Sequence, residues 1–163
     1  MNEPGNGLAA GAKARTTAAW LAYGETLDQS SLFLTLLALC GIFWGALVPA
    51  AQVALMLAVA FGALQKIYAL RVGFDRRLFA DWALRWSPGA AGGVEADLAA
   101  FDEALVPMGL RAKGAAPTRG LDERIGGACR LFSKQVFWLL LQFVALAVAG
   151  GLGVMPVLQA WPH

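Results

Sequence analysis

Three long apolar runs constrain the fold of this chain more than any other feature of its sequence. They are "LFLTLLALCGIFWGALV" at 32–48, "AAQVALMLAVAFGALQ" at 50–65 and "VFWLLLQFVALAVAGGLGVMPVL" at 136–158. None contains Asp, Glu, Lys, Arg or His. A membrane-crossing helix needs about 20 mostly apolar residues, and the second run approaches that length because the stem of Lys66 can snorkel. Since an uncharged run leaves a helix no polar face for water, we predict three transmembrane helices.

The composition agrees with an all-α integral membrane protein. Hydrophobic residues make up 58% of the chain and charged residues 15%, against about a quarter charged in soluble domains. Pro49 separates the first two runs and disfavours helix at the residue before it, which predicts a tight hairpin. The predicted segments are a flexible or interfacial N-terminus (1–29), a transmembrane hairpin (30–71), a juxtamembrane segment with amphipathic helices (72–134), a third span (135–158) and an external tail (159–163).

The distribution of basic residues predicts the orientation. From Arg71 to Lys134, between the second and third spans, the chain has ten arginines and lysines, and none lies in the turn around Pro49. Positively charged segments stay on the cytoplasmic side of a membrane. We therefore expect a bacterial inner-membrane protein with a cytoplasmic N-terminus and middle segment, and a periplasmic C-terminus.

The middle segment contains one clear helical pattern, "VEADLAAFDEALV" at 94–106. Apolar residues recur there at steps of four, three and four, which indicates one face of a helix. Four acidic residues cover the other positions, and we expect them, Asp102 included, to cap helices or face solvent. A second helix is predicted to begin in "LDERIGGACRLFSKQ" and to continue into the third span.

Residues that carry enzyme chemistry are sparse. The only histidine is His163, the last residue, and Cys40 and Cys129 lie in unrelated surroundings. Haem, zinc and iron–sulfur sites need clustered His or Cys, so we expect no cofactor, no metal and no catalytic residue. The net charge of +2 comes from interleaved acids and bases, whereas nucleic-acid binding needs a one-sided basic face. We predict a protein that is not an enzyme and does not bind nucleic acid.

The spans carry small residues that favour helix packing. Gly41 and Gly45 are four residues apart, a spacing that lets helix backbones approach closely in lipid. They could pack within the chain or against a partner's helix. The notable polar groups of the spans are Thr35, Gln52, Gln65 and Gln142, of which Gln142 lies deepest and is predicted to bond to a neighbouring helix.

The stretch "LRVGFDRRLFADWALRW" at 70–86 mixes charge with aromatic rings directly after the second run. At about 100° per residue its rings gather on one side, and Asp75 lies among them. The simpler interpretation is an interfacial helix whose arginines hold the orientation. The sharper hypothesis is a docking surface for another subunit. The candidate partner-binding residues are Phe74, Asp75, Phe79, Trp82, Trp86, Gly41 and Gly45.

These observations lead to one main functional hypothesis and two alternatives. The main one is a small non-catalytic accessory or structural subunit of an inner-membrane complex, which binds a larger membrane partner through its spans and cytoplasmic segment. The first alternative is a self-assembling small channel or holin-like protein, for which the glutamines and Thr35 would have to line a pore. The second is an enzyme acting on lipid head groups through Asp75. The expected partners are other integral membrane subunits, the lipid bilayer and, as a further option, copies of the same chain.

Overall fold

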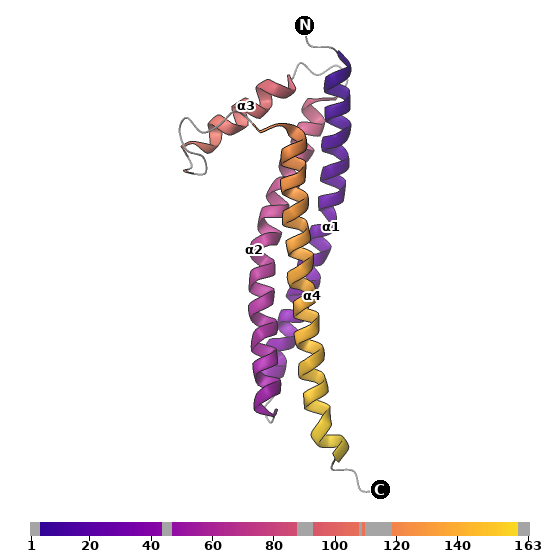
Figure 1. Ribbon diagram of the computed structural model, residues 1–163, viewed down its shortest axis with the longest axis vertical. Coiled ribbons are helices and arrows are strands. Elements are labelled where there is room, and N and C mark those ends of the chain that lie inside the picture. The colour runs from indigo at the N-terminus through magenta and orange to yellow at the C-terminus, as the bar shows by residue number, and fades with distance from the viewer. Residues whose placement is uncertain (1–3, 44–46, 88–92, 108, 110–118, 160–163) are drawn as a thin grey trace. The chain divides into compact units, whose positions relative to one another are not determined.

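Four α-helices make up the computed structural model over the residues it describes, which are 4–43, 47–87, 93–107, 109 and 119–159. Three of the helices are long and one is short, as can be followed in Figure 1, and these ranges contain no strand. Three of them are long and apolar enough to cross a membrane, so the prediction of an all-helical chain with three candidate spans is confirmed. The helices are α1 (Pro4–Phe43), α2 (Pro49–Arg85), α3 (Val94–Leu105) and α4 (Leu121–Gln159).

Helix α1 begins far before the first apolar run. The sequence predicted a flexible or interfacial segment over residues 1–29, whereas residues 4–29 belong to the same continuous helix as the residues that follow. Both helix propensity and packing explain why this segment is helical. This part of the chain is rich in alanine, the strongest helix former, and Ala10, Ala14 and Leu21 are buried. Small residues that looked like a linker therefore form one packed face of a helix.

Helix α2 begins at Pro49 and continues without a break to Arg85. Proline suits the first position of a helix because its fixed φ is helical and it needs no N–H there. The carbonyl of Val48 accepts the N–H of Ala51 at 2.9 Å. Most of the stretch predicted as an interfacial helix, 70–86, is thus the C-terminal part of α2, which ends one residue before Trp86. At about 1.5 Å per residue α2 is roughly 55 Å long, well beyond the ~30 Å of a bilayer core.

Helices α3 and α4 begin close to where the sequence predicted them. Helix α3 covers Val94–Leu105, one residue short of the pattern found in the sequence. Helix α4 begins at Leu121 with Asp122 and Glu123 in its first turn, where acidic side chains interact favourably with the helix dipole. Gly126 and Gly127 do not interrupt it.

The chain divides into two compact units, which are described separately. The first consists of Met1–Ala22 with Phe74–Arg130, and the second of Tyr23–Gly73 with Leu131–His163. The second unit contains all three apolar runs. The charged residues that fall within its segments are Glu25, Asp28, Lys66, Arg71 and Lys134.

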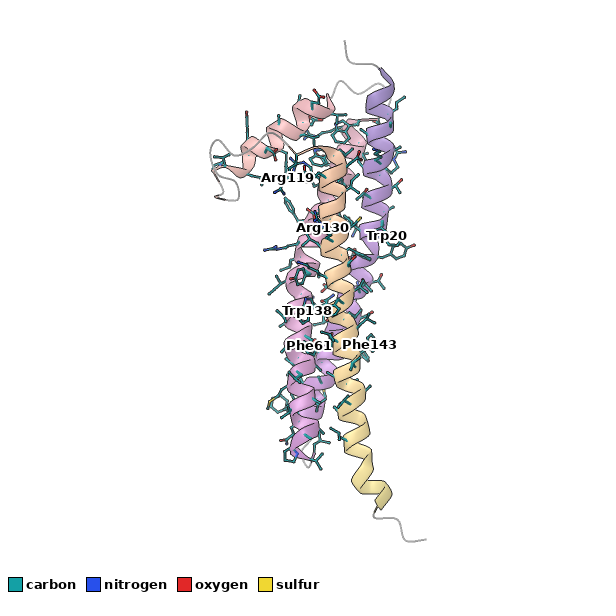
Figure 2. All side chains as sticks on the ribbon, viewed as in Figure 1. Trp20, Phe61, Arg119, Arg130, Trp138 and Phe143 are labelled. Atoms are coloured by element: carbon teal, nitrogen blue, oxygen red, sulfur yellow. The ribbon has the colours of Figure 1, made fainter. Side chains whose placement is uncertain are left out.

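The core of the second unit is built from small side chains. Ala38 of α1, Ala58 of α2 and Ala149 of α4 belong to one buried cluster, and close approach of helices is what drives association in lipid. Large apolar residues such as Phe33 and Phe143 are instead exposed, as expected of a surface that meets hydrocarbon. Aromatic rings also join helices, as the contact of Phe61 with Trp138 at 5.8 Å between centroids shows (Figure 2).

The first unit has a core of larger rings. Phe79 and Trp82 of α2 are buried, and so is Trp86, the residue that follows the helix. Gly11 of α1 passes so close to α2 that a β-carbon there would lie 2.7 Å from the carbonyl oxygen of Trp86. The fold of this unit therefore depends on glycine at position 11.

Candidate functional site

Gln142 forms the best-connected polar site of the second unit. Its amide oxygen accepts the hydroxyl of Ser31 at 2.7 Å, and its amide nitrogen donates to the Ser31 carbonyl at 3.1 Å and to Thr35 Oγ1 at 2.8 Å. The side chain is fully buried. On the side of α2, a β-carbon at Gly62 would lie 2.8 Å from the Gln142 amide nitrogen and would also collide with Thr35 Oγ1. The prediction that Gln142 bonds to a neighbouring helix is confirmed.

Gln135 repeats this arrangement seven residues earlier on α4. It is also fully buried, and its amide nitrogen donates to the carbonyl of Gly24 at 2.7 Å. Gly24 precedes Ser31 by seven residues, so the two glutamines meet α1 at the same interval. Within the described residues, however, the amide oxygen of Gln135 has no hydrogen-bond partner. The two glutamines thus occupy equivalent positions on α4, but only the amide oxygen of Gln142 accepts a hydrogen bond.

The second unit also contains an ion pair and a third buried glutamine. Lys66 Nζ is 2.6 Å from Asp28 Oδ1, and both side chains keep partial exposure, at 41% and 29%. Gln65, next to Lys66 on α2, is 0% exposed. Lys134 places its ammonium 5.8 Å from the centroid of the Tyr68 ring. Lys66, Asp28 and Lys134 therefore contact other side chains near one end of the apolar segments, as expected near a membrane–water interface.

The first unit contains an aromatic cluster, defined here as Phe79, Trp82, Trp86 and Phe101. Trp82 is at its centre: it stacks on Trp86 at 5.4 Å between centroids and meets Phe79 and Phe101 edge-on, each at 5.6 Å. Such offset and edge-on pairs add about 0.5–1.5 kcal/mol each beyond the area they bury. The cluster joins α3, through Phe101, to α2.

The partly buried Arg124 of α4 places its charge against this cluster. Its guanidinium carbon lies 5.7 Å from the Trp82 centroid and 5.2 Å from the Phe101 centroid, within the range of a cation–π interaction. Its Nη2 donates to Asp102 Oδ1, and its Nε donates to the Arg119 carbonyl at 3.1 Å. Asp102, predicted on a capping or solvated face, is instead buried. A buried carboxylate needs such a partner because desolvation alone would destabilise it.

A second contact joins α3 to α2. The indole N–H of Trp86 donates to Asp97 Oδ2 at 2.8 Å. Arg85 reaches the other oxygen of Asp97 at 3.8 Å and binds Asp81 one turn earlier at 2.9 Å. Acidic residues that the sequence assigned to a solvated surface therefore help to attach α3.

The structure divides the predicted partner-binding residues into three groups. Phe79, Trp82 and Trp86 are covered by the chain's own residues, whereas Phe74 remains 55% exposed beside Phe101 and Asp75 is partly buried. Gly41 of α1 faces α2, where its β-carbon would lie 3.0 Å from Leu55 Cδ1. Gly45 lies outside the described residues.

Four residues of these sites escaped sequence reasoning: Ser31, Arg124, Gln135 and, as a buried group, Asp102. A signal existed for Gln135, because Ala128, Gln135, Gln142 and Ala149 follow each other at intervals of seven on the buried face of α4. No local pattern pointed to the pair of Arg124 with Asp102, which lie 22 residues apart.

Among the described residues, no group of three or more His, Cys, Asp or Glu side chains could hold a metal ion. Cys40 is an exposed free thiol and Cys129 is partly buried. A scan against models of protein families, a search of curated proteins and a search of solved structures each found no match to this chain.

Proposed function

We propose that this protein is a small non-catalytic accessory subunit of a bacterial inner-membrane complex, with its first unit on the cytoplasmic side. In this proposal the spans anchor a larger membrane partner, and the charged unit contacts that partner or a soluble protein. The orientation rests on the basic residues between the second and third apolar runs.

The proposal rests on the hydrogen bonds among the buried polar side chains of the second unit. Gln142, Ser31 and Thr35 bind one another inside a single chain, and a β-carbon at Gly62 would find no room beside them. These are among the groups that a pore-forming protein would need to expose to water. Because these three polar side chains bond to one another within one chain, they support the role of a structural subunit over that of a channel.

The first unit supplies a surface for contact outside the apolar segments. Phe74 and Leu84 of α2 are 55% and 74% exposed, and Leu8 of α1 is also more than half exposed. Large apolar side chains exposed in a charged unit are candidates for a protein interface. Of the predicted docking residues, Phe74 and Asp75 stay in the proposal, whereas Trp82 is unsuited as a test because its removal would open the aromatic cluster.

The test is isolation of the native complex in a gentle detergent or native nanodiscs, followed by quantitative mass spectrometry. We expect a larger membrane protein in a fixed ratio to this chain. The variants Phe74→Ala and Leu84→Ala should lower that ratio while insertion is unchanged, and Glu103→Ala, on the exposed face of α3, serves as the control. Recovery of the chain alone, together with ion flux through liposomes that contain it, would overturn the proposal in favour of a self-assembling channel.

A further inference from the structure

Two exposed basic residues lie at the same level of the second unit, one on α2 and one on α4. A β-carbon at Gly24 would lie 2.8 Å from Val72 Cγ1 and 3.1 Å from the amide oxygen of Gln135. Val72 of α2 and Gln135 of α4 therefore meet α1 at one level. The residues directly before them are Arg71 and Lys134, and both are exposed. These two residues are called the basic pair below.

The basic pair lies on the side of the unit where α2 and α4 meet. The Lys134 ammonium is 5.8 Å from the centroid of the Tyr68 ring, so Tyr68 is on the side of α2 next to α4. Lys66 instead binds Asp28 of α1. At about 100° per residue, Arg71 is about 60° from Tyr68 around α2 and about 140° from Lys66. Arg71 is therefore on the same side of the unit as Lys134.

Exposed apolar side chains continue from the basic pair along the same two helices. On α2, Leu64 and Leu57 lie seven and fourteen residues before the arginine, an interval that keeps residues on nearly the same side of a helix. On α4, Leu141 and Val148 follow the lysine at the same interval. Leu57, Leu64 and Val148 are exposed and Leu141 is partly exposed. Because α2 and α4 run in opposite directions (Figure 1), both series lead away from the basic pair in one direction.

The positive charges of the basic pair are not matched by an acidic residue of α2 or α4 within this unit. The acidic residues in the segments of the second unit are Glu25 and Asp28, which both belong to α1. Along α2 the next carboxylate is that of Asp75, one turn after Arg71, which is partly buried and belongs to the first unit. The α2–α4 side of the second unit thus combines two cations with an exposed apolar surface.

From this arrangement we propose that the α2–α4 side of the second unit binds one anionic phospholipid. Its phosphate lies between Arg71 and Lys134, and an acyl chain lies along the apolar residues that follow them. Guanidinium and ammonium groups form strong, charge-assisted hydrogen bonds to phosphate oxygens, and basic sites between transmembrane helices bind anionic head groups. A soluble phosphate would use the two cations only, whereas a phospholipid also covers the exposed leucines. The site requires that the apolar runs lie in a bilayer, as proposed above, but it does not require a protein partner.

Native mass spectrometry of the full-length protein in detergent tests the proposal, with phosphatidylglycerol and phosphatidylcholine as probes. We expect one phosphatidylglycerol molecule to bind more than tenfold more tightly than phosphatidylcholine, because each cation near a lipid phosphate contributes about fivefold in affinity. Arg71→Gln and Lys134→Gln should each weaken phosphatidylglycerol binding by about that factor, whereas Lys134→Arg should preserve it. Equal affinity of the unchanged protein for the two lipids would overturn the proposal without the use of any variant.

Arg77→Gln is the matched control, because it removes an exposed arginine of the same helix within the first unit. Its affinity for phosphatidylglycerol should stay within about twofold of that of the unchanged protein, since salt screens distant exposed charges. Equal losses in Arg77→Gln and Arg71→Gln would indicate a general attraction between basic residues and anionic lipid, and would contradict a defined site.

Two further results separate this site from other occupants of the same surface. An excess of inorganic phosphate should leave the lipid bound, and displacement would assign the basic pair to a soluble phosphate instead. If Arg71→Gln lowered recovery of a membrane partner but left lipid binding unchanged, the surface would be a protein interface. Recovery of the chain without a partner, by contrast, would contradict the subunit proposal and leave the lipid affinity as expected here.

Discussion

The two units bury polar groups of different kinds. The first unit buries a charged pair, Arg124 with Asp102, surrounded by aromatic rings and a backbone carbonyl. The second unit buries neutral amides and hydroxyls, and its ion pair of Lys66 with Asp28 keeps partial exposure. The difference follows from the surroundings of each unit. In a helical bundle with an apolar outer surface, burying a neutral amide costs far less free energy than burying a charge.

The contrast also predicts how strongly each unit depends on its polar groups. A buried charge that loses its partner is left uncompensated, whereas an amide that loses one hydrogen bond can bind another group in an apolar bundle. The substitutions below test this difference, beginning with the largest expected effect.

Arg124→Met should destabilise the first unit most, by about 3–5 kcal/mol, because it removes the guanidinium that pairs with the buried Asp102 carboxylate. The fluorescence of Trp82 and Trp86 during urea unfolding in detergent reports on this unit. Arg119→Met is the control, since that side chain is largely exposed. The double variant Arg124→Met with Asp102→Leu should recover much of the loss. A loss no larger than that of the control would show that the buried pair does not hold α3.

Gly62→Ala should destabilise the second unit by about 1–3 kcal/mol, because the added methyl group has no space beside Thr35 and Gln142. Gly150→Ala is a matched control on α4 of the same unit, where a β-carbon would meet nothing within 4 Å. That variant should stabilise its helix by roughly 0.5–1 kcal/mol through the better propensity of alanine. Unfolding in mixed micelles with increasing SDS measures both. Similar values for the two glycines would contradict the tight packing of α1, α2 and α4.

Gln142→Leu should cost about 0.6–1.7 kcal/mol, the range measured for hydrogen bonds between membrane helices. Ser31→Ala, which removes only the hydroxyl donor, should cost less. The same micelle titration compares them. If Gln142→Leu were as damaging as Arg124→Met, the contrast between charged and neutral buried groups would fail.

Lys13→Ala should have the smallest effect, about 0.5 kcal/mol or less. The Lys13 ammonium binds Asp122 of the first unit at 2.7 Å, but both side chains are largely exposed, and exposed ion pairs contribute little. Urea unfolding at low and high salt provides the measurement. A clear, salt-sensitive loss would mean that this pair belongs to a larger network.

Sequence reasoning succeeded where periodicity and hydropathy were sufficient. The three apolar runs, the start of α3 at Val94 and the interhelical bonding of Gln142 could all be predicted from local patterns. The full length of α1 and α2 could not be predicted in this way. Outside the apolar segments a helix can contain polar residues, so hydropathy does not mark where it begins or ends. The alanine-rich sequence before the first run is compatible with either a linker or a helix.

The first unit was harder to predict because its contacts join residues distant in sequence. Asp102 looks like one of several acids on an exposed face, and only the position of Arg124 on another helix makes it a buried partner. The rings of Trp82 and Trp86 were correctly expected on one side of a helix. Their pattern could not reveal that α3 of the same chain covers them.

The seven-residue interval shared by Gln135 and Gln142 has a consequence for the alignment of α4 along α1. Each glutamine binds a carbonyl 111 residues earlier in the chain, so sliding α4 by one interval would bring Gln135 to Ser31 and Thr35. The small buried residues recur at the same spacing and would tolerate that shift. A polar group at one position of a repeating apolar seam is what selects a single alignment. We therefore expect the hydroxyl groups of Ser31 and Thr35, rather than the alanines, to favour the observed alignment.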